Sequence, residues 1–131
     1  MIFVDTGAWF ASVVMRDANH AAAVAWLGQN REPLVTTDYV VDETLTLLRA
    51  RDEHGCALDI GEQIFCGELA ELVFVQESDL RAAWTTFRNF ADKEWSFTDC
   101  CSKVVMERLG IRTAFAFDQH FRQFGTINVV P

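Results

Sequence analysis

The stretch TAFAFD, residues 113–118, is an apolar run that ends on a carboxylate. The chain opens on the same pattern, because MIFVD at residues 1–5 also runs from apolar side chains to an aspartate. Short apolar runs bounded by polar residues are typical of strands buried on both faces. Each run therefore predicts a buried strand with an acid, Asp118 or Asp5, just after its carboxyl end.

Strands and helices alternate along the rest of the chain. The sequence predicts helices over residues 20–29, 38–53, 57–70, 78–91 and 96–109, a short helical turn over 120–124, and further strands over 34–37, 72–75 and 127–130. Residues 5–7 read as a turn, Asp38 and Ser78 as helix caps, and Ser96 with Asp99 as a capping box. This alternation favours an α/β fold with a parallel sheet covered by helices on both faces.

Length and composition limit the class of protein. With 131 residues, half of them hydrophobic, residues 1–131 are expected to form a single domain with a substantial core. No run approaches the roughly 18 apolar residues of a membrane helix. The start lacks the features of a signal peptide, so we expect a cytoplasmic protein without a membrane contact. The four cysteines form no Cys-x2-Cys pair, which favours reduced core residues over a zinc site.

The net charge of −8 argues against binding nucleic acid by surface charge alone. It is compatible with a nucleic-acid enzyme if some of the acids bind divalent cations, because a cation reverses the local field. The helical spacing of Trp84, Phe87 and Phe90 predicts core positions. Trp9, Phe10 and Trp95 are left as candidates for a partner surface.

Four acids occupy positions where the active site of such a sheet is found. Asp5 and Asp118 follow strands, Asp99 lies in the first turn of a capped helix, and Glu43 lies about one and a half turns into another helix. Taken singly, each also fits an ordinary turn, cap or solvated position, and Asp42 could act in place of Glu43. Together at one sheet edge they would repel one another, and bound Mg²⁺ or Mn²⁺ is the simplest compensation. One ion or two are both possible.

Other polar residues near these acids are less decisive. Thr6 and Thr98 each flank an acid and could orient it, or could be ordinary cap hydroxyls. Lys103 lies one turn after Asp99, and we expect an ion pair with that residue in preference to a phosphate contact. The three histidines have no evident partner and are expected to be surface or capping residues.

These segments, in this order and at this spacing, resemble the PIN-domain family over the entire chain. The resemblance is carried by four segments: VDTGA at residues 4–8, TTDYVVDE at 36–43, SFTDC at 96–100, and AFDQHF at 116–121 followed by Phe124 and Gly125. It implies a three-layer α/β/α sandwich with a five-stranded parallel sheet and a Mg²⁺- or Mn²⁺-dependent endoribonuclease. It also implies a VapC-like toxin of a type II toxin–antitoxin pair, which forms a homodimer and is inhibited by its antitoxin.

The family pattern also assigns site residues. It maps its acidic quartet onto Asp5, Glu43, Asp99 and Asp118, and its hydroxyl positions onto Thr6 and Thr98. One departure is Asp38, where relatives often carry an uncharged polar residue, so an additional acid could alter the affinity for metal.

Three alternatives compete with this interpretation. A phosphatase of the haloacid-dehalogenase type needs a second aspartate two residues after the first, where Gly7 stands. A receiver domain needs a lysine after a late strand, where Asp118 stands. A PIN-fold RNA- or protein-binding module without catalysis is the remaining alternative, and the intact acids argue against it.

Overall fold

The computed structural model describes residues 1–131. Its elements are, in chain order, β1 (Ile2–Val4), α1 (Thr6–Val13), α2 (His20–Gln29), β2 (Leu34–Thr37), α3 (Asp38–Ala50), α4 (His54–Phe65), β3 (Glu71–Val73), α5 (Glu77–Asn89), α6 (Phe97–Leu109), β4 (Thr113–Phe115), the 3-10 helix η1 (Phe121–Phe124) and β5 (Asn128–Val130).

The five strands form one parallel sheet in the order β3-β2-β1-β4-β5. The central strand β1 pairs with β2 on one side and β4 on the other, and Val4 lies opposite Phe115 in the register with β4. The order reverses at β1 and β4, because the chain leaves β1 toward β2 and β3 and returns past β1 to β4. Such a reversal point is where ligands bind in open α/β sheets.

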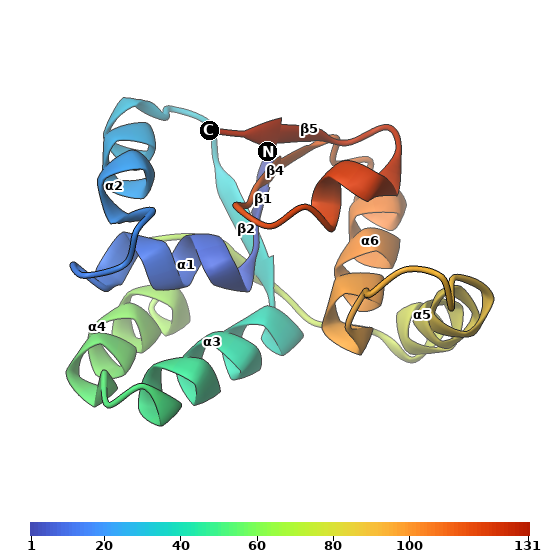
Figure 1. Ribbon diagram of the computed structural model, residues 1–131, viewed down its shortest axis with the longest axis horizontal. Coiled ribbons are helices and arrows are strands. Elements are labelled where there is room, and N and C mark those ends of the chain that lie inside the picture. Colours follow the sequence, from blue (N-terminus) through green and yellow to red (C-terminus); the bar gives the residue numbers. More distant parts are fainter.

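The helices cover both faces of the sheet, so the predicted three-layer α/β/α arrangement is confirmed. Helices α1 to α4 lie on one side, and α5 with α6 lie on the other (Figure 1). The two sides follow from the handedness of parallel crossovers. The connections from β1 to β3 move one way across the sheet, and the connection from β3 to β4 moves back.

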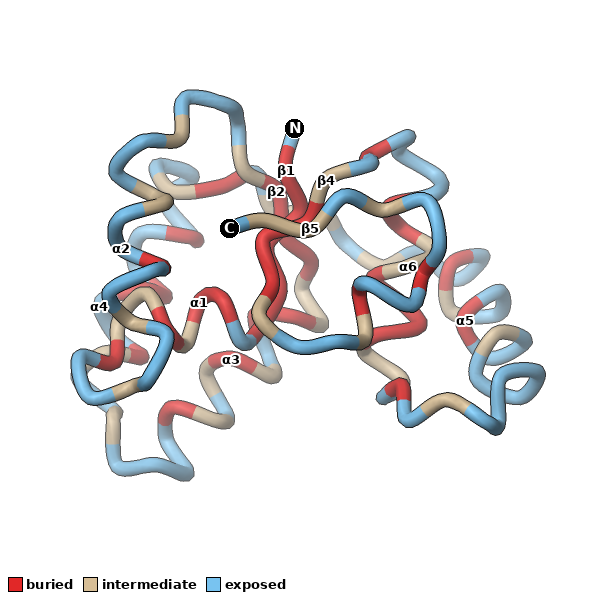
Figure 2. The backbone as a smooth tube through the Cα atoms, turned by 45° about the horizontal axis from the view of Figure 1, so that its top comes forward, coloured by how far each residue is buried: buried red, intermediate tan, exposed pale blue.

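The core lies around the central strands. Phe3, Val4, Val35 and Phe115 are fully buried, and the tube of Figure 2 is red along β1 and β2. Trp9 of α1 is also fully buried, and its indole N–H donates to the hydroxyl of Thr36 at 3.2 Å. Burial on both faces explains why these strands lack an alternating polar pattern.

Two helices begin where the sequence predicted something else. The segment after β1 is not a turn, because α1 starts at Thr6 directly after an extended Asp5. Asp38 does not cap α3: the hydroxyl of Thr37 accepts the N–H of Val40 at 3.2 Å, and the Asp38 carboxylate accepts the N–H of Val75 at 2.8 Å. A contact 37 residues away in sequence has replaced the local one.

Several boundaries of the predicted elements are shifted. Helix α3 ends at Ala50 instead of residue 53, because Asp52 adopts a left-handed φ of 58°. Helix α4 covers 54–65 instead of 57–70, and Gly67 follows it with a φ of 81°. Ser78 is not the cap of α5, which begins at Glu77 after Gln76. Strand β4 ends at Phe115, two residues before the predicted end.

Three aromatic residues on α5 and at its C-terminal end were predicted to lie in the core, and this is wrong. Trp84, Phe87 and Phe90 are 54%, 42% and 41% exposed. Helix α5 packs mainly on α6 and lies at the outside of the molecule (Figures 1 and 2), so only a narrow strip around Ala83 is buried. The assignment of Trp95 to a partner surface is also wrong, because Trp95 is 6% exposed; the same holds for Trp9.

The cysteines are all free, as expected. Cys100 and Cys101 are buried in the core, Cys56 is half-buried, and Cys66 is exposed after α4, so the core assignment is wrong for Cys66. None of the helices combines the length and the apolar character required to cross a bilayer.

Candidate metal centre

The start of α6 places Asp99 by the capping box that the sequence predicted. The Ser96 hydroxyl accepts the N–H of Asp99 at 3.0 Å, and the N–H of Ser96 donates to Oδ2 of Asp99 at 3.0 Å. The Asp99 side chain is 7% exposed. Local sequence therefore determines both the position of this carboxylate and the orientation of one of its oxygens.

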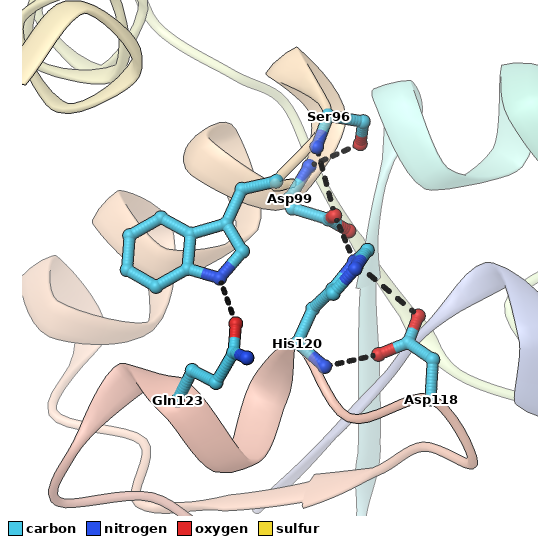
Figure 3. Close-up of polar contacts among 6 residues, drawn as sticks. Ser96, Asp99, Asp118, His120 and Gln123 are labelled. Carbon is cyan, nitrogen blue, oxygen red and sulfur yellow. Dashed lines mark hydrogen bonds and ion pairs between the residues drawn. The ribbon is translucent and has the colours of Figure 1, made fainter. Parts of the chain in front are cut away.

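The segment after β4 brings Asp118 and His120 to the same place. The N–H of His120 donates to Oδ1 of Asp118 at 2.9 Å. The Nδ1 atom of His120 lies 2.8 Å from Oδ2 of Asp99 and 4.0 Å from Oδ2 of Asp118 (Figure 3). One ligand atom from each of Asp99, Asp118 and His120 can be chosen so that all lie within 4.8 Å of one another. Three side chains from α6 and from the segment after β4 thus lie close enough together to share one ion.

Asp5 is the most deeply buried of the predicted acids, with 3% exposure. Burial raises the pKa of its carboxyl well above the usual range, and the negative charges of Asp118, Asp99 and Glu43 raise that pKa further. The backbone N–H of Thr6 opposes the shift without cancelling it. All four acids of the predicted set are therefore close enough to interact electrostatically, and no basic side chain contributes to the balance at Asp5.

Asp118 belongs to the same electrostatic unit. Its side chain is 44% exposed. Partial burial and the nearby charge of Asp99 raise the pKa of its carboxyl, while hydrogen bonds from the backbone of His120 and Phe121 and the charge of His120 act in the opposite direction. The carboxyls of Asp5 and Asp118 therefore hold a proton more tightly than usual, and binding of a divalent cation would displace it.

The remaining candidates lie around this cluster with less contact. Glu43 is half-buried on α3, and its neighbour Asp42 is exposed, which favours Glu43 of the two. Thr98 is half-buried beside Asp99. The Thr6 hydroxyl is buried and has no hydrogen-bond partner, an uncommon state for a buried hydroxyl that indicates a missing polar neighbour.

The donor set fits a hard divalent cation. Carboxylate oxygens are the ligands that Mg²⁺ and Mn²⁺ prefer in proteins. The uncompensated carboxylate of Asp5 and the unpartnered hydroxyl of Thr6 are the two features that a bound hydrated cation would satisfy.

Sequence reasoning missed one member of the cluster and one ion pair. His120 was expected to be a surface or capping residue without a partner, and this is wrong, because it contacts Asp99. The available signal was its place two residues after Asp118 in the turn that follows a strand. Lys103 pairs with Glu107, one turn further along α6, instead of Asp99. Glu107 has no other hydrogen-bond donor, whereas Asp99 already has two.

Comparisons with known proteins identify the family of the chain. A PIN domain family model matches residues 2–127. The chain is 33% identical over 131 residues to the 23S rRNA-specific endonuclease VapC20 of Mycobacterium tuberculosis, covering 100% of this chain and 99% of that protein. It is 28% identical over 123 residues to the VapC ribonuclease of Archaeoglobus fulgidus, covering 90% of this chain and 77% of that protein.

Solved structures show the same similarity. The crystal structure of Mycobacterium tuberculosis VapC20, described as a Sarcin-Ricin loop cleaving toxin, superposes with a TM-score of 0.93 at 31% identity, with both chains covered completely. FitAcB from Neisseria gonorrhoeae superposes with a TM-score of 0.70 at 18% identity, covering 100% of this chain and 97% of that one. The second comparison bears on the fold alone.

Proposed function

This chain belongs to the PIN domain family, and from that premise we propose that it is an endoribonuclease whose Mg²⁺ or Mn²⁺ is held by Asp5, Glu43, Asp99 and Asp118. The reaction is the hydrolysis of a phosphodiester bond of RNA. The proposal depends chiefly on one observation: the carboxyl of Asp5 is buried, and its pKa is raised by burial and by three neighbouring carboxylates, with no basic side chain to offset them. A buried charge in this state is costly unless a cation compensates it.

The residues of the chain divide the chemistry among them. A bound divalent cation would lower the pKa of a water molecule and offset charge on the phosphate. Asp99 is held in one orientation by the start of α6, and Asp118 is held by the backbone of residue 120. Asp5 lies deepest and supplies charge from a rigid strand end, while the Thr6 hydroxyl beside it is available as a hydrogen-bond donor or acceptor.

Two features favour catalysis over the alternative of an inert binding module. All four acids of the family pattern are present, and the relatives, matched over 100% and 90% of this chain, are named as an endonuclease and a ribonuclease. A module that only binds RNA would gain nothing from clustered, mutually repelling carboxylates, two of them buried, which also repel phosphates. Because VapC20 matches over the whole length of both chains, 23S rRNA is the first substrate to test.

We also propose that the protein is the toxin of a type II toxin–antitoxin pair and forms a homodimer. Support for the pairing comes from the VapC relatives and from the toxin description of VapC20. Growth arrest on expression, relieved by co-expression of a neighbouring reading frame, would support the pairing. Size-exclusion chromatography with light scattering measures the oligomeric state.

The test of activity is cleavage of purified RNA. The protein is incubated with 23S rRNA and with a total RNA pool, in Mn²⁺, Mg²⁺ or EDTA, and the new ends are mapped by sequencing. We expect discrete cleavage with either cation and none in EDTA. The variants Asp5→Asn and Asp99→Asn are expected to lose cleavage by several orders of magnitude while retaining the fold.

The matched control is Asp42→Asn, which removes the same charge from an exposed position beside Glu43. We expect it to cleave at the wild-type rate. Undiminished cleavage by both Asp5→Asn and Asp99→Asn would refute the assigned site. The absence of any cleavage and of any melting-temperature shift in Mn²⁺ would favour the inert module.

A further inference from the structure

His120 makes a contact that the proposed chemistry does not yet use. Its Nδ1 atom lies 2.8 Å from Oδ2 of Asp99, the same oxygen that accepts the backbone N–H of Ser96 at 3.0 Å. Two donors therefore converge on one oxygen of the carboxylate, and they fix the rotation of the whole group. The other oxygen, Oδ1, receives neither of these hydrogen bonds.

The tautomer of His120 follows from its partner. An ionised carboxylate only accepts hydrogen bonds, so the hydrogen must be on Nδ1. Neutral imidazole satisfies this requirement as well as the charged form does, and the contact needs no change of protonation. The ring is 23% exposed, so most of its surface is packed against the protein.

His120 also holds the second carboxylate, by a different group. Its backbone N–H donates to Oδ1 of Asp118 at 2.9 Å. The ring nitrogen is 4.0 Å from Oδ2 of Asp118, beyond hydrogen-bond distance. The side chain thus holds Asp99 at the start of α6, and the main chain holds Asp118 after β4 (Figure 3). One residue sets the spacing between acids from two separate elements.

We propose that His120 is a positioning residue, which fixes the Asp99 carboxylate so that its free oxygen is presented to the metal. This inference rests on the proposed metal-dependent function of the same site. Carboxylates that bind metal ions are themselves oriented by hydrogen bonds from outer residues, and loss of such an outer partner weakens metal binding by about 10- to 100-fold. The same atom, Nδ1, cannot both donate to Asp99 and bind a cation.

Three substitutions at this position separate the roles of its atoms. The amide nitrogen of asparagine and Nδ1 of histidine are separated from Cβ by the same number of bonds. The amide nitrogen of glutamine lies one bond further out, as Nε2 of histidine does. His120→Asn therefore retains a donor to Asp99, whereas His120→Gln and His120→Ala remove it. The backbone N–H that holds Asp118 is unchanged in all three variants.

The measurement is binding of Mn²⁺ and of Mg²⁺ to the full chain, by isothermal titration, with Mn²⁺ confirmed by electron paramagnetic resonance. We expect His120→Ala and His120→Gln to bind both ions about 10- to 100-fold more weakly. His120→Asn should stay within about threefold of wild type. In RNA cleavage at saturating metal, kcat should fall in the first two variants while KM for RNA is unchanged.

Three results would overturn the inference. The first is wild-type metal affinity in His120→Ala, and the second is an equal loss of affinity in His120→Asn and His120→Ala. The third is a loss of Mn²⁺ affinity with Mg²⁺ affinity intact, because nitrogen donors favour Mn²⁺ over Mg²⁺ and this would make His120 a direct ligand. Asp99→Asn is measured alongside. If that variant also binds metal normally, the proposed function fails; if it does not, only the role of His120 fails.

Discussion

Replacing Asp5 by asparagine is expected to stabilise the protein in EDTA while abolishing its response to metal. Burial, and then the charges of Asp118, Asp99 and Glu43, raise the pKa of Asp5 in the folded state. An acid with a raised folded pKa holds its proton more tightly when folded. Its stabilising contribution is present below the unfolded pKa and is lost as pH rises through the folded pKa. At pH values above the unfolded pKa, Asp5 therefore destabilises the metal-free fold relative to an uncharged asparagine.

The size of the effect can be worked from the length of the chain. With an unfolding entropy of about 2.1 cal/mol/K per residue, 131 residues correspond to about 0.28 kcal/mol/K. Each unit by which the folded pKa exceeds the unfolded one costs about 1.4 kcal/mol at pH values above both. Asp5→Asn should then raise the melting temperature in EDTA by about 5 °C per unit. Mn²⁺ at 100 times its Kd should raise that of the wild type by about 10 °C, and that of the variant hardly at all.

The assay is thermal unfolding followed by circular dichroism, in EDTA and in Mn²⁺, at several pH values. The advantage of Asp5→Asn over wild type in EDTA should shrink as pH falls, because the wild-type carboxyl then takes up its proton. A variant that melts below the wild type in EDTA would refute the electrostatic argument. A variant that keeps the full Mn²⁺ response would refute the assignment of Asp5 to the metal.

Three further expectations concern the fold and the thiols. Arg108→Ala should cost about 3 kcal/mol in urea unfolding, because it leaves the buried Asp79 without its two 2.8 Å hydrogen bonds from Arg108. Burial alone would raise the pKa of Asp79, but Arg108 and a backbone N–H lower it. The wild type should therefore lose this stabilising contribution as pH falls through the lowered pKa, and the variant should not. Trp84→Ala should change the free energy of unfolding by less than about 1 kcal/mol, since the side chain is 54% exposed. A cost of about 3 kcal/mol would instead indicate that Trp84 is a core residue. A thiol reagent should label the exposed Cys66 in the folded protein, whereas Cys101, buried with its pKa raised by burial to about 12, should react only on unfolding.

Local chemistry was sufficient wherever neighbours in the sequence decide the structure. The capping box of Ser96 and Asp99 depends on two residues three positions apart, and both hydrogen bonds are present. The strand at residues 34–37 and the helix at residues 20–29 have the predicted bounds. Local signals failed where a distant partner competes with a near one. Asp38 is a residue type that commonly caps helices. Its carboxylate instead accepts a hydrogen bond from the N–H of Val75, which the pairing of β2 with β3 brings close.

The sequence alone determined the succession of strands and helices, the resemblance to the PIN family, and the acids after the strands, because periodicity and capping are properties of short segments. Only the tertiary structure decided which side chains meet. The apolar spacing of Trp84 and Phe87 marks one face of a helix, but that face is buried only if another element packs on it. No element covers that face of α5, and both side chains are exposed. His120 joins Asp99 because the reversal of strand order at β1 and β4 brings the segment after β4 to the start of α6, 21 residues away in sequence.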